Sequence, residues 1–148
     1  MCGAHATVRG LLGEIVAQTG NHRDIVVDME AGLEHLSRGT GRHVSRFVAV
    51  LEPYYRSMET ARRVAALAAE LGIVDVVALA NKVRDDSDRR AIAEFCAAHG
   101  LRLVGEIPYD PTLVEAERVG TPPIDHDPTS PAVSAIRELA GSLVADAA

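Results

Sequence analysis

The sequence is poor in aromatic residues, which limits what its core can be made of. It has no tryptophan, two phenylalanines and three tyrosines, so aromatics account for 3% of 148 residues. Since 47% of the residues are hydrophobic, we expect a core packed mainly from Val, Leu, Ile and Ala side chains. A chain of this length is typical of one domain, and we predict a single domain over residues 1–148.

Positive charge, long hydrophobic runs and paired cysteines are also scarce. The formal net charge is −6, which disfavours non-specific binding to nucleic acid or to an anionic membrane surface. No window approaches the roughly 18 continuous apolar residues of a membrane span, and the N-terminus lacks the pattern of a signal peptide. Cys2 and Cys96 lie far apart and do not indicate a disulfide framework. These absences predict a soluble, cytoplasmic protein with no nucleic-acid or membrane partner.

Four short apolar runs lack the alternation of polar and apolar residues that a one-sided sheet would show. They span residues 24–29, 46–52, 74–81 and 101–107. Strands that are buried on both faces have this composition, and a parallel sheet covered by helices provides that burial.

Amphipathic helical patterns lie around these runs, at residues 5–18, 57–72, 85–100, 111–120 and 130–147. The stretch 121–131 is rich in proline, which is typical of a loop. Strands that alternate with helices imply right-handed crossovers. The sequence therefore predicts an α/β fold with a mainly parallel sheet and flanking helices.

Each predicted strand ends on polar or turn-forming residues. The first ends on Asp28, the second on Glu52, the third on Asn81 and Lys82, and the fourth on Pro108, Tyr109 and Asp110. In open α/β sheets, ligands bind beyond the carboxyl ends of the strands. Any one of these ends could be a strand leaving into a polar loop, but the four together favour a ligand site at this edge.

Several stretches of the sequence, taken together, carry a resemblance to a known family. They are CGAHATVRGLL (2–12), DMEAGLEH (28–35), EPYYRSMETARRV (52–64), ANKVRD (80–85) and GEIPYDPTLVEAERVGTPP (105–123). The chain resembles the C-terminal portion of P-loop ATPases of the MinD, ParA and nitrogenase-iron-protein group. Within that group it looks most like the CooC type, the accessory ATPase of nickel insertion into carbon monoxide dehydrogenase.

The resemblance implies that Asp28 and Gly32 act in catalysis. Asp28 would help to hold the Mg²⁺ ion of bound ATP, because a Mg²⁺ ion that bridges two phosphates keeps several waters and needs an anionic oxygen near them. Gly32 would let the following loop approach the phosphates and move when the γ-phosphate leaves. From the residues alone, Asp28 could also cap the turn after its strand.

The resemblance also implies a set of residues that bind the adenine base of ATP. They are Asn81, Lys82, Pro108, Tyr109 and Asp110. In GTPases an Asp three residues after the Asn pairs with guanine, whereas here that position is Arg84, whose guanidinium can only donate hydrogen bonds. This difference favours ATP over GTP. From the residues alone, Asn81 could also be a turn-former, and Pro108 could belong to an ordinary proline turn.

A metal site is implied near the start of the chain. In the resembled family, two cysteines separated by one residue come from each of two subunits and form a site suited to Zn²⁺ or Ni²⁺. Here only Cys2 is present, since position 1 is Met. His5 could complete a set of two thiolates and two imidazoles across a homodimer. The alternative is an exposed terminal thiol beside a surface histidine.

The sequence contains no G-x-x-x-x-G-K-[ST] loop, and its single lysine is Lys82. Such a loop holds phosphates through its backbone N–H groups and its lysine. We therefore expect an incomplete P-loop NTPase fold that lacks the P-loop strand. The strands at 24–29 and 46–52 would then pair directly or leave open edges, which invites association. We expect a partner, either a second copy or a separate P-loop half.

Three hypotheses for the function follow. The first is the C-terminal part of a CooC-type ATPase, a metallochaperone-like factor that assists a client such as carbon monoxide dehydrogenase. On its own this part would not be expected to hydrolyse ATP. The second is a non-catalytic binding or dimerisation module. The third is a positioning ATPase like MinD or ParA, which the low basic charge of residues 130–147 disfavours.

Overall fold

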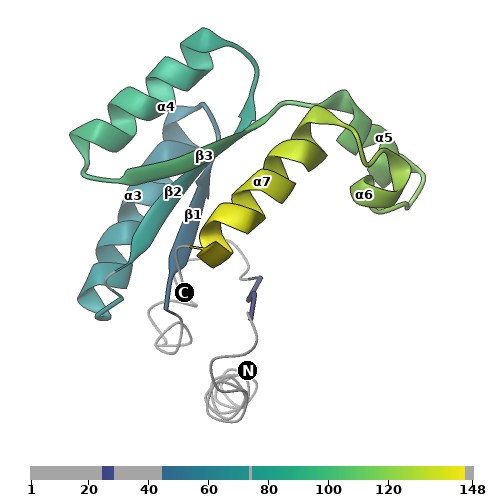
Figure 1. Ribbon diagram of the computed structural model, residues 1–148. Helices are drawn as coiled ribbons and strands as arrows, with labels where there is room; N and C mark the ends of the chain where they lie inside the picture. Colours follow the sequence, from purple (N-terminus) through teal and green to yellow (C-terminus); the bar gives the residue numbers. More distant parts are fainter. Residues whose placement is uncertain (1–24, 29–44, 74, 146–148) are drawn as a thin grey trace, which may run out of the picture.

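A three-stranded parallel sheet with helices on both faces forms the centre of the structure (Figure 1). The computed structural model describes residues 25–28, 45–73 and 75–145. Its elements are β1 (Phe47–Leu51), α3 (Tyr55–Glu70), β2 (Val76–Val83), α4 (Asp86–Ala98), β3 (Arg102–Pro108), α5 (Pro111–Arg118), α6 (Pro123–His126) and α7 (Pro131–Ala145). The strand order is β1-β2-β3, and both pairings are parallel. The predicted α/β class is confirmed.

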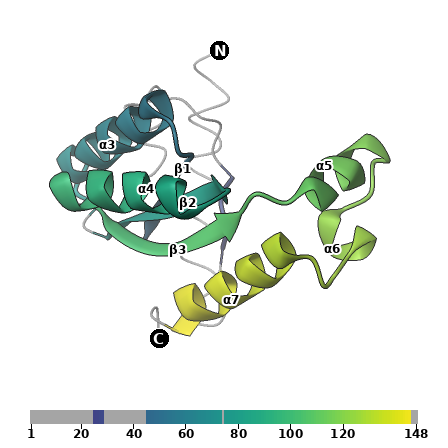
Figure 2. The same ribbon diagram turned by 90° about the horizontal axis from the view of Figure 1, so that it is seen from above.

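The central strand β2 is buried on both faces, as its apolar composition predicts. Ala78 and Ala80 belong to one hydrophobic cluster with Ile92 of α4. Leu79 belongs to a second cluster with Ala132 of α7. Figure 2 shows α3 and α4 on one side of the sheet and α7 on the other. The core therefore consists of two thin aliphatic layers on either side of β2.

Local signals set the bounds of the helices. The side chain of Asp85 accepts hydrogen bonds from the backbone N–H groups of Ser87 and Asp88 and so caps the start of α4. Gly100 follows the end of α4 with φ +67°, a left-handed conformation that glycine adopts without steric cost. These signals place α4 close to the predicted helix at residues 85–100.

A cluster of charges joins the amino ends of the three strands. The carboxylate of Asp75 accepts hydrogen bonds from Arg46 at 2.6 Å and from Arg102 at 2.9 Å. Arg46 also donates to the backbone carbonyl of Leu143, at 3.2 Å, near the end of α7. The hydrogen bond from Arg46 lowers the pKa of Asp75, and the one from Arg102 adds to this effect. The charged side chains at the amino-end edge of the sheet therefore bind one another and the end of α7.

The prediction of a strand at residues 24–29 is wrong for the part that the structure describes. Residues 25–28 form no strand, and Val26 is 93% exposed. An apolar run forms a buried strand only where another strand pairs with it and side chains cover it. Within the described ranges no strand pairs with residues 25–28, and three of these four residues are exposed.

The remaining predictions have mixed outcomes. The strands predicted at 46–52, 74–81 and 101–107 correspond to β1, β2 and β3. The predicted loop at 121–131 contains the short helix α6, which begins at Pro123. The helix predicted at 5–18 lies outside the described residues. Among the helices that the structure describes, none combines the length and apolarity needed to cross a membrane.

The outer edge of β1 is open in the part of the chain that the structure describes. There β1 pairs with β2 alone. Val50, the fourth of the five residues of β1, is 55% exposed. An unpaired strand edge beside an exposed apolar side chain is a site where another strand can add.

Candidate functional site

The carboxyl ends of the strands meet at one edge of the sheet, as a parallel arrangement requires. Leu51, the last residue of β1, stands opposite Ala80 of β2, so Glu52 comes beside Asn81. On the other side, the backbone N–H of Tyr109 donates to the carbonyl of Val83 at 2.9 Å. The sequence-predicted residues of β2 and of the β3 end are therefore brought together.

A bulge interrupts β2 at Asn81 and Lys82. Ala80 stands opposite Glu106 and Val83 opposite Pro108, so β2 advances from 80 to 83 while β3 advances from 106 to 108. One extra residue is therefore inserted in β2. In a regular strand, Val83 would share a face with Leu79. The bulge instead places Val83 in the α4-side cluster, together with Ala80.

Lys82 carries the backbone strain of this bulge. Its φ is +56°, the left-handed region that costs a residue with a side chain about 1–2 kcal/mol. Burying a Val side chain is worth about 1.5–3 kcal/mol. Val83 is buried on the α4 side as a result of the bulge, and its burial is of the same order as the strain at Lys82 and offsets it.

An ion pair joins the bulge to the end of β1. The Nζ of Lys82 lies 3.0 Å from Oε1 of Glu52. The hydrogen bond with Glu52 raises the pKa of Lys82, and the charge of the same carboxylate adds to it. Glu52 is itself held in place, because its backbone N–H donates to Oγ of Ser57 in α3 at 2.9 Å. An exposed pair of this kind is worth about 0–1 kcal/mol, so it matters more for geometry than for stability.

Asn81 has a side-chain amide that is not engaged by the described part of the protein. Its side chain is partly exposed, and no described residue forms a hydrogen bond with its amide. Arg84 is turned to α4 instead, where its guanidinium donates two hydrogen bonds to Asp88, at 2.8 Å and 3.0 Å. The position that carries an acceptor for guanine in GTPases therefore holds a donor that is already occupied.

Asp110 has a structural role in the described contacts. One carboxylate oxygen accepts from the backbone N–H of Thr112 at 2.9 Å and caps α5, and the other accepts from the N–H of Ala132 at 3.2 Å. Burial raises the pKa of Asp110, but the hydrogen bonds from Thr112, Ala132 and Ser130 together outweigh burial and lower it. A direct role of Asp110 in binding a nucleotide stays a prediction, as it does for the partly exposed Pro108 and the exposed Tyr109.

The described part of the structure does not bring the remaining predicted site residues to the strand-end edge. Asp28 is exposed and stays outside the three-stranded sheet. Gly32, Cys2 and His5 lie outside the described residues. Among the residues that the structure does describe, no three His, Cys, Asp or Glu side chains come together as metal ligands.

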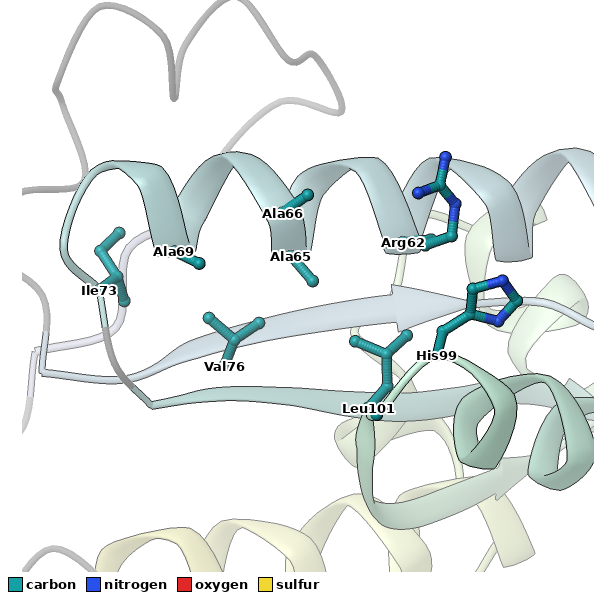
Figure 3. Close-up of a pocket in the computed structure, with 9 residues that line it drawn as sticks. Arg62, Ala65, Ala66, Ala69, Ile73, Val76, His99 and Leu101 are labelled. Carbon is teal, nitrogen blue, oxygen red and sulfur yellow. The ribbon is translucent and has the colours of Figure 1, made fainter.

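A hollow of about 510 Å³ lies at the opposite edge of the sheet (Figure 3). Ala65 and Ala69 of α3 line it, together with Val76 and Leu101 at the amino ends of β2 and β3. His99 flanks it, but this ring stacks on Phe95 with centroids 4.1 Å apart. Arg62 also lines the hollow, but its guanidinium is paired with Glu59. The small apolar side chains offer little to fix a polar ligand, and the hollow lies away from the predicted site.

The pairing of Glu52 with Lys82 is the feature of the candidate site that the sequence alone did not indicate. The strand-end pattern showed Glu52 and Lys82 as separate polar residues, without indicating that they pair. Their order on neighbouring parallel strands was the available signal, because residues at the carboxyl ends of adjacent strands lie side by side.

Comparison with known proteins finds relatives of this chain. The chain is 37% identical to the carbon monoxide dehydrogenase accessory protein CooC of Rhodospirillum rubrum over 98% of its length and 51% of that protein. It is 34% identical to an uncharacterized ATP-binding protein of Methanocaldococcus jannaschii over 82% of its length and 47% of that protein. The chain thus spans about half the length of these relatives. No protein-family model matches it.

Solved structures show the same fold. The MinD cell division protein of Aquifex aeolicus aligns with a TM-score of 0.77, covering 95% of this chain and 61% of that one, at 23% identity. MinD of Pyrococcus horikoshii, solved with Mg-ADP, aligns with a TM-score of 0.72 over 92% of this chain and 56% of that one, at 21% identity. The fold is thus the α/β architecture of P-loop NTPases, present in part. With the sequence similarity added, the chain belongs to the family of CooC- and MinD-type P-loop ATPases.

Proposed function

We propose that the strand-end edge is the adenine-binding half of a nucleotide site. We further propose that the chain serves a CooC-type ATPase that assists nickel insertion into carbon monoxide dehydrogenase. The observation that carries the first proposal is the bulge in β2, where the Asn81 amide has no hydrogen-bond partner among the described residues at the edge where the strand ends meet. The second rests on the similarity to CooC.

The chemistry of Asn81 suits adenine. A side-chain amide donates through its nitrogen and accepts through its oxygen, and adenine presents an amino donor beside a ring-nitrogen acceptor. Guanine presents a carbonyl oxygen where adenine has its amino group. Because Arg84 supplies no acceptor and is held by Asp88, the site offers little to guanine. Tyr109, exposed at the same edge, offers a ring face on which a base could stack.

Magnesium would accompany the nucleotide. Asp28, an exposed carboxylate, would take part in holding it, and Gly32 would lie in the loop that responds to the phosphates. When bound, Mg²⁺ would neutralise part of the phosphate charge. Since no G-x-x-x-x-G-K-[ST] loop occurs in the sequence, we expect this chain alone to bind ATP weakly and not to turn it over.

Nickel would be the cargo of the full assembly. Cys2 and His5 from two copies of the chain would supply two thiolates and two imidazoles, a set that suits Ni²⁺ or Zn²⁺. Metal content of the purified dimer and of a Cys2→Ala variant tests this. Equal metal content in both would remove Cys2 from the proposal.

A second candidate function is a non-catalytic binding module, and one observation favours it. The edge of β1 with which no described strand pairs carries the 55% exposed Val50 and could accept a strand from a separate chain that bears the P-loop. Such a partner would make the sheet and the nucleotide site continuous. Size measurement of the purified chain tests the need for a partner, since a monomer that unfolds cooperatively would contradict it.

Titration of the ¹⁵N-labelled chain with adenosine tests the main proposal. Adenosine carries no phosphate, so it probes the base-binding half alone. We expect the backbone amides of residues 80–84 and 109–110 to shift in a saturable way. Shifts confined to other parts of the chain, or none at millimolar adenosine, would contradict the proposal.

A further inference from the structure

We propose that Glu52 and Lys82 form a positioning pair, which holds the bulge of β2 so that the Asn81 amide is presented to a purine base. This inference rests on the proposed function of the strand-end edge. It adds Glu52 to the site and gives Lys82 a role other than contact with phosphate.

The first step concerns the backbone of Lys82. A residue with a side chain stays in the left-handed region only where its surroundings over-determine that conformation. Lys82 has φ +56° and directly follows Asn81. Any change in the Lys82 backbone therefore moves the Asn81 amide. The position of Asn81 depends on what holds Lys82.

The second step identifies what holds it. Pairing with β3 resumes at Val83, on the far side of the bulge. The ammonium of Lys82 is tied to Glu52 at 3.0 Å, and the backbone of Glu52 is tied to Ser57 at 2.9 Å. A continuous path therefore runs from the first turn of α3 through Glu52 to the bulge. The path crosses from β1 to β2 at the edge where the base would sit.

The third step separates positioning from phosphate binding. Two carboxylates act on the Lys82 charge: Glu52 in contact, and Glu117 of α5 from further away. Glu52 and Glu117 are negative and would repel a phosphate. The ammonium of Lys82 is thus already paired with a carboxylate of the protein. Its contribution to a nucleotide site is to fix geometry.

Purine selectivity is the property that a misplaced Asn81 would lose. Adenosine presents an amino donor beside a ring-nitrogen acceptor, whereas inosine presents a carbonyl acceptor in place of the amino group. A well-placed amide discriminates between them by roughly tenfold. Both nucleosides are uncharged, so a change in the charge of Glu52 or Lys82 does not act on them through phosphate.

The experiment titrates the full ¹⁵N-labelled chain with adenosine and with inosine. Wild type should prefer adenosine by roughly tenfold. Glu52→Gln and Lys82→Met should each bring the preference close to one, and the exchanged variant Glu52→Lys with Lys82→Glu should restore it. Glu59→Gln is the matched control, because it removes an ion pair with Arg62 and Arg63 in α3 but none at the bulge.

The outcomes are distinct. If wild type shows no shifts at the strand ends, the proposed function fails. If wild type prefers adenosine and the single variants keep the same preference, the positioning pair is disproved and the function stands. Should the variants fail to fold, wild type in rising NaCl replaces them. Screening of the exposed pair should then lower the preference, and a preference unchanged up to about 1 M salt would overturn the inference.

Discussion

The carboxylate of Asp110 accepts a hydrogen bond from the backbone N–H of Ala132, 22 residues further along the chain, at 3.2 Å. The same carboxylate caps α5 through the N–H of Thr112. One buried side chain therefore fixes the beginnings of both α5 and α7 relative to the end of β3. The helices that flank the candidate site depend on this link.

Replacing Asp110 should be costly. Asp110→Ala leaves two N–H groups without their acceptor, of which that of Ala132 is buried, and we expect a loss of about 1–3 kcal/mol in the free energy of unfolding. Urea unfolding of the variant measures this loss. Asp125→Ala in α6 is the control, because Asp125 is exposed and should change stability by less than about 0.5 kcal/mol. Equal losses in the two variants would contradict the role of Asp110.

The same residue predicts a dependence of stability on acid. The folded state lowers the pKa of Asp110 below its ordinary value of 3.8, because its hydrogen bonds favour the carboxylate more than burial disfavours it. A lowered folded pKa gives stability that is present above about pH 4 and is lost as the pH falls through the folded value. The stability difference between wild type and Asp110→Asn should thus be larger at pH 7 than at pH 2. A difference that stays constant would argue against an ionised Asp110.

The backbone of Lys82 predicts an unusual order of stabilities. In most strands glycine is less stable than alanine by about 0.5–1 kcal/mol. At φ +56° the order should reverse, so that Lys82→Gly is more stable than Lys82→Ala by about 1 kcal/mol. Both variants lose the ammonium, so the ion pair with Glu52 cancels in the comparison. Thermal unfolding of the two variants measures which of them is more stable. If Lys82→Ala were the more stable one, the left-handed conformation at the bulge would be contradicted.

Much of the fold could be predicted from the sequence, because apolar runs and helical periodicity are local signals. The apolar run at 74–81 predicted β2. The acidic start and the terminal glycine of the pattern at 85–100 predicted α4. The run at 24–29 has the same composition but forms no strand in the described part, since strand formation depends on pairing that composition does not encode.

The candidate site was predictable in outline only. That Asn81 and Lys82 lie at the strand-end edge followed from a parallel sheet. The bulge could not be predicted, because neither Asn81 nor Lys82 is a glycine, the residue type that usually indicates a left-handed backbone conformation. The structural use of Asp110 was also hidden, since its partner Ala132 is distant in sequence and donates through its backbone.

Asn81 should govern the choice of base. In Asn81→Ala the amide is gone, and we expect the preference for adenosine over inosine to fall by roughly tenfold, to near one. Arg84→Ala is the comparison, because Arg84 pairs with Asp88 and should leave the preference unchanged. Chemical-shift titration of both variants provides the readout. An unchanged preference in Asn81→Ala would assign base recognition to other residues.

The ratio of the dissociation constants for adenosine and for Mg-ATP, measured on the same purified chain, tests the central claim most directly. The chain is proposed to hold the base but to lack the loop that holds the phosphates. We therefore predict that both ligands bind weakly, with constants within about tenfold of each other and with no release of phosphate. Mg-ATP binding that is tighter than adenosine binding by about a thousandfold, or turnover of ATP, would contradict the account.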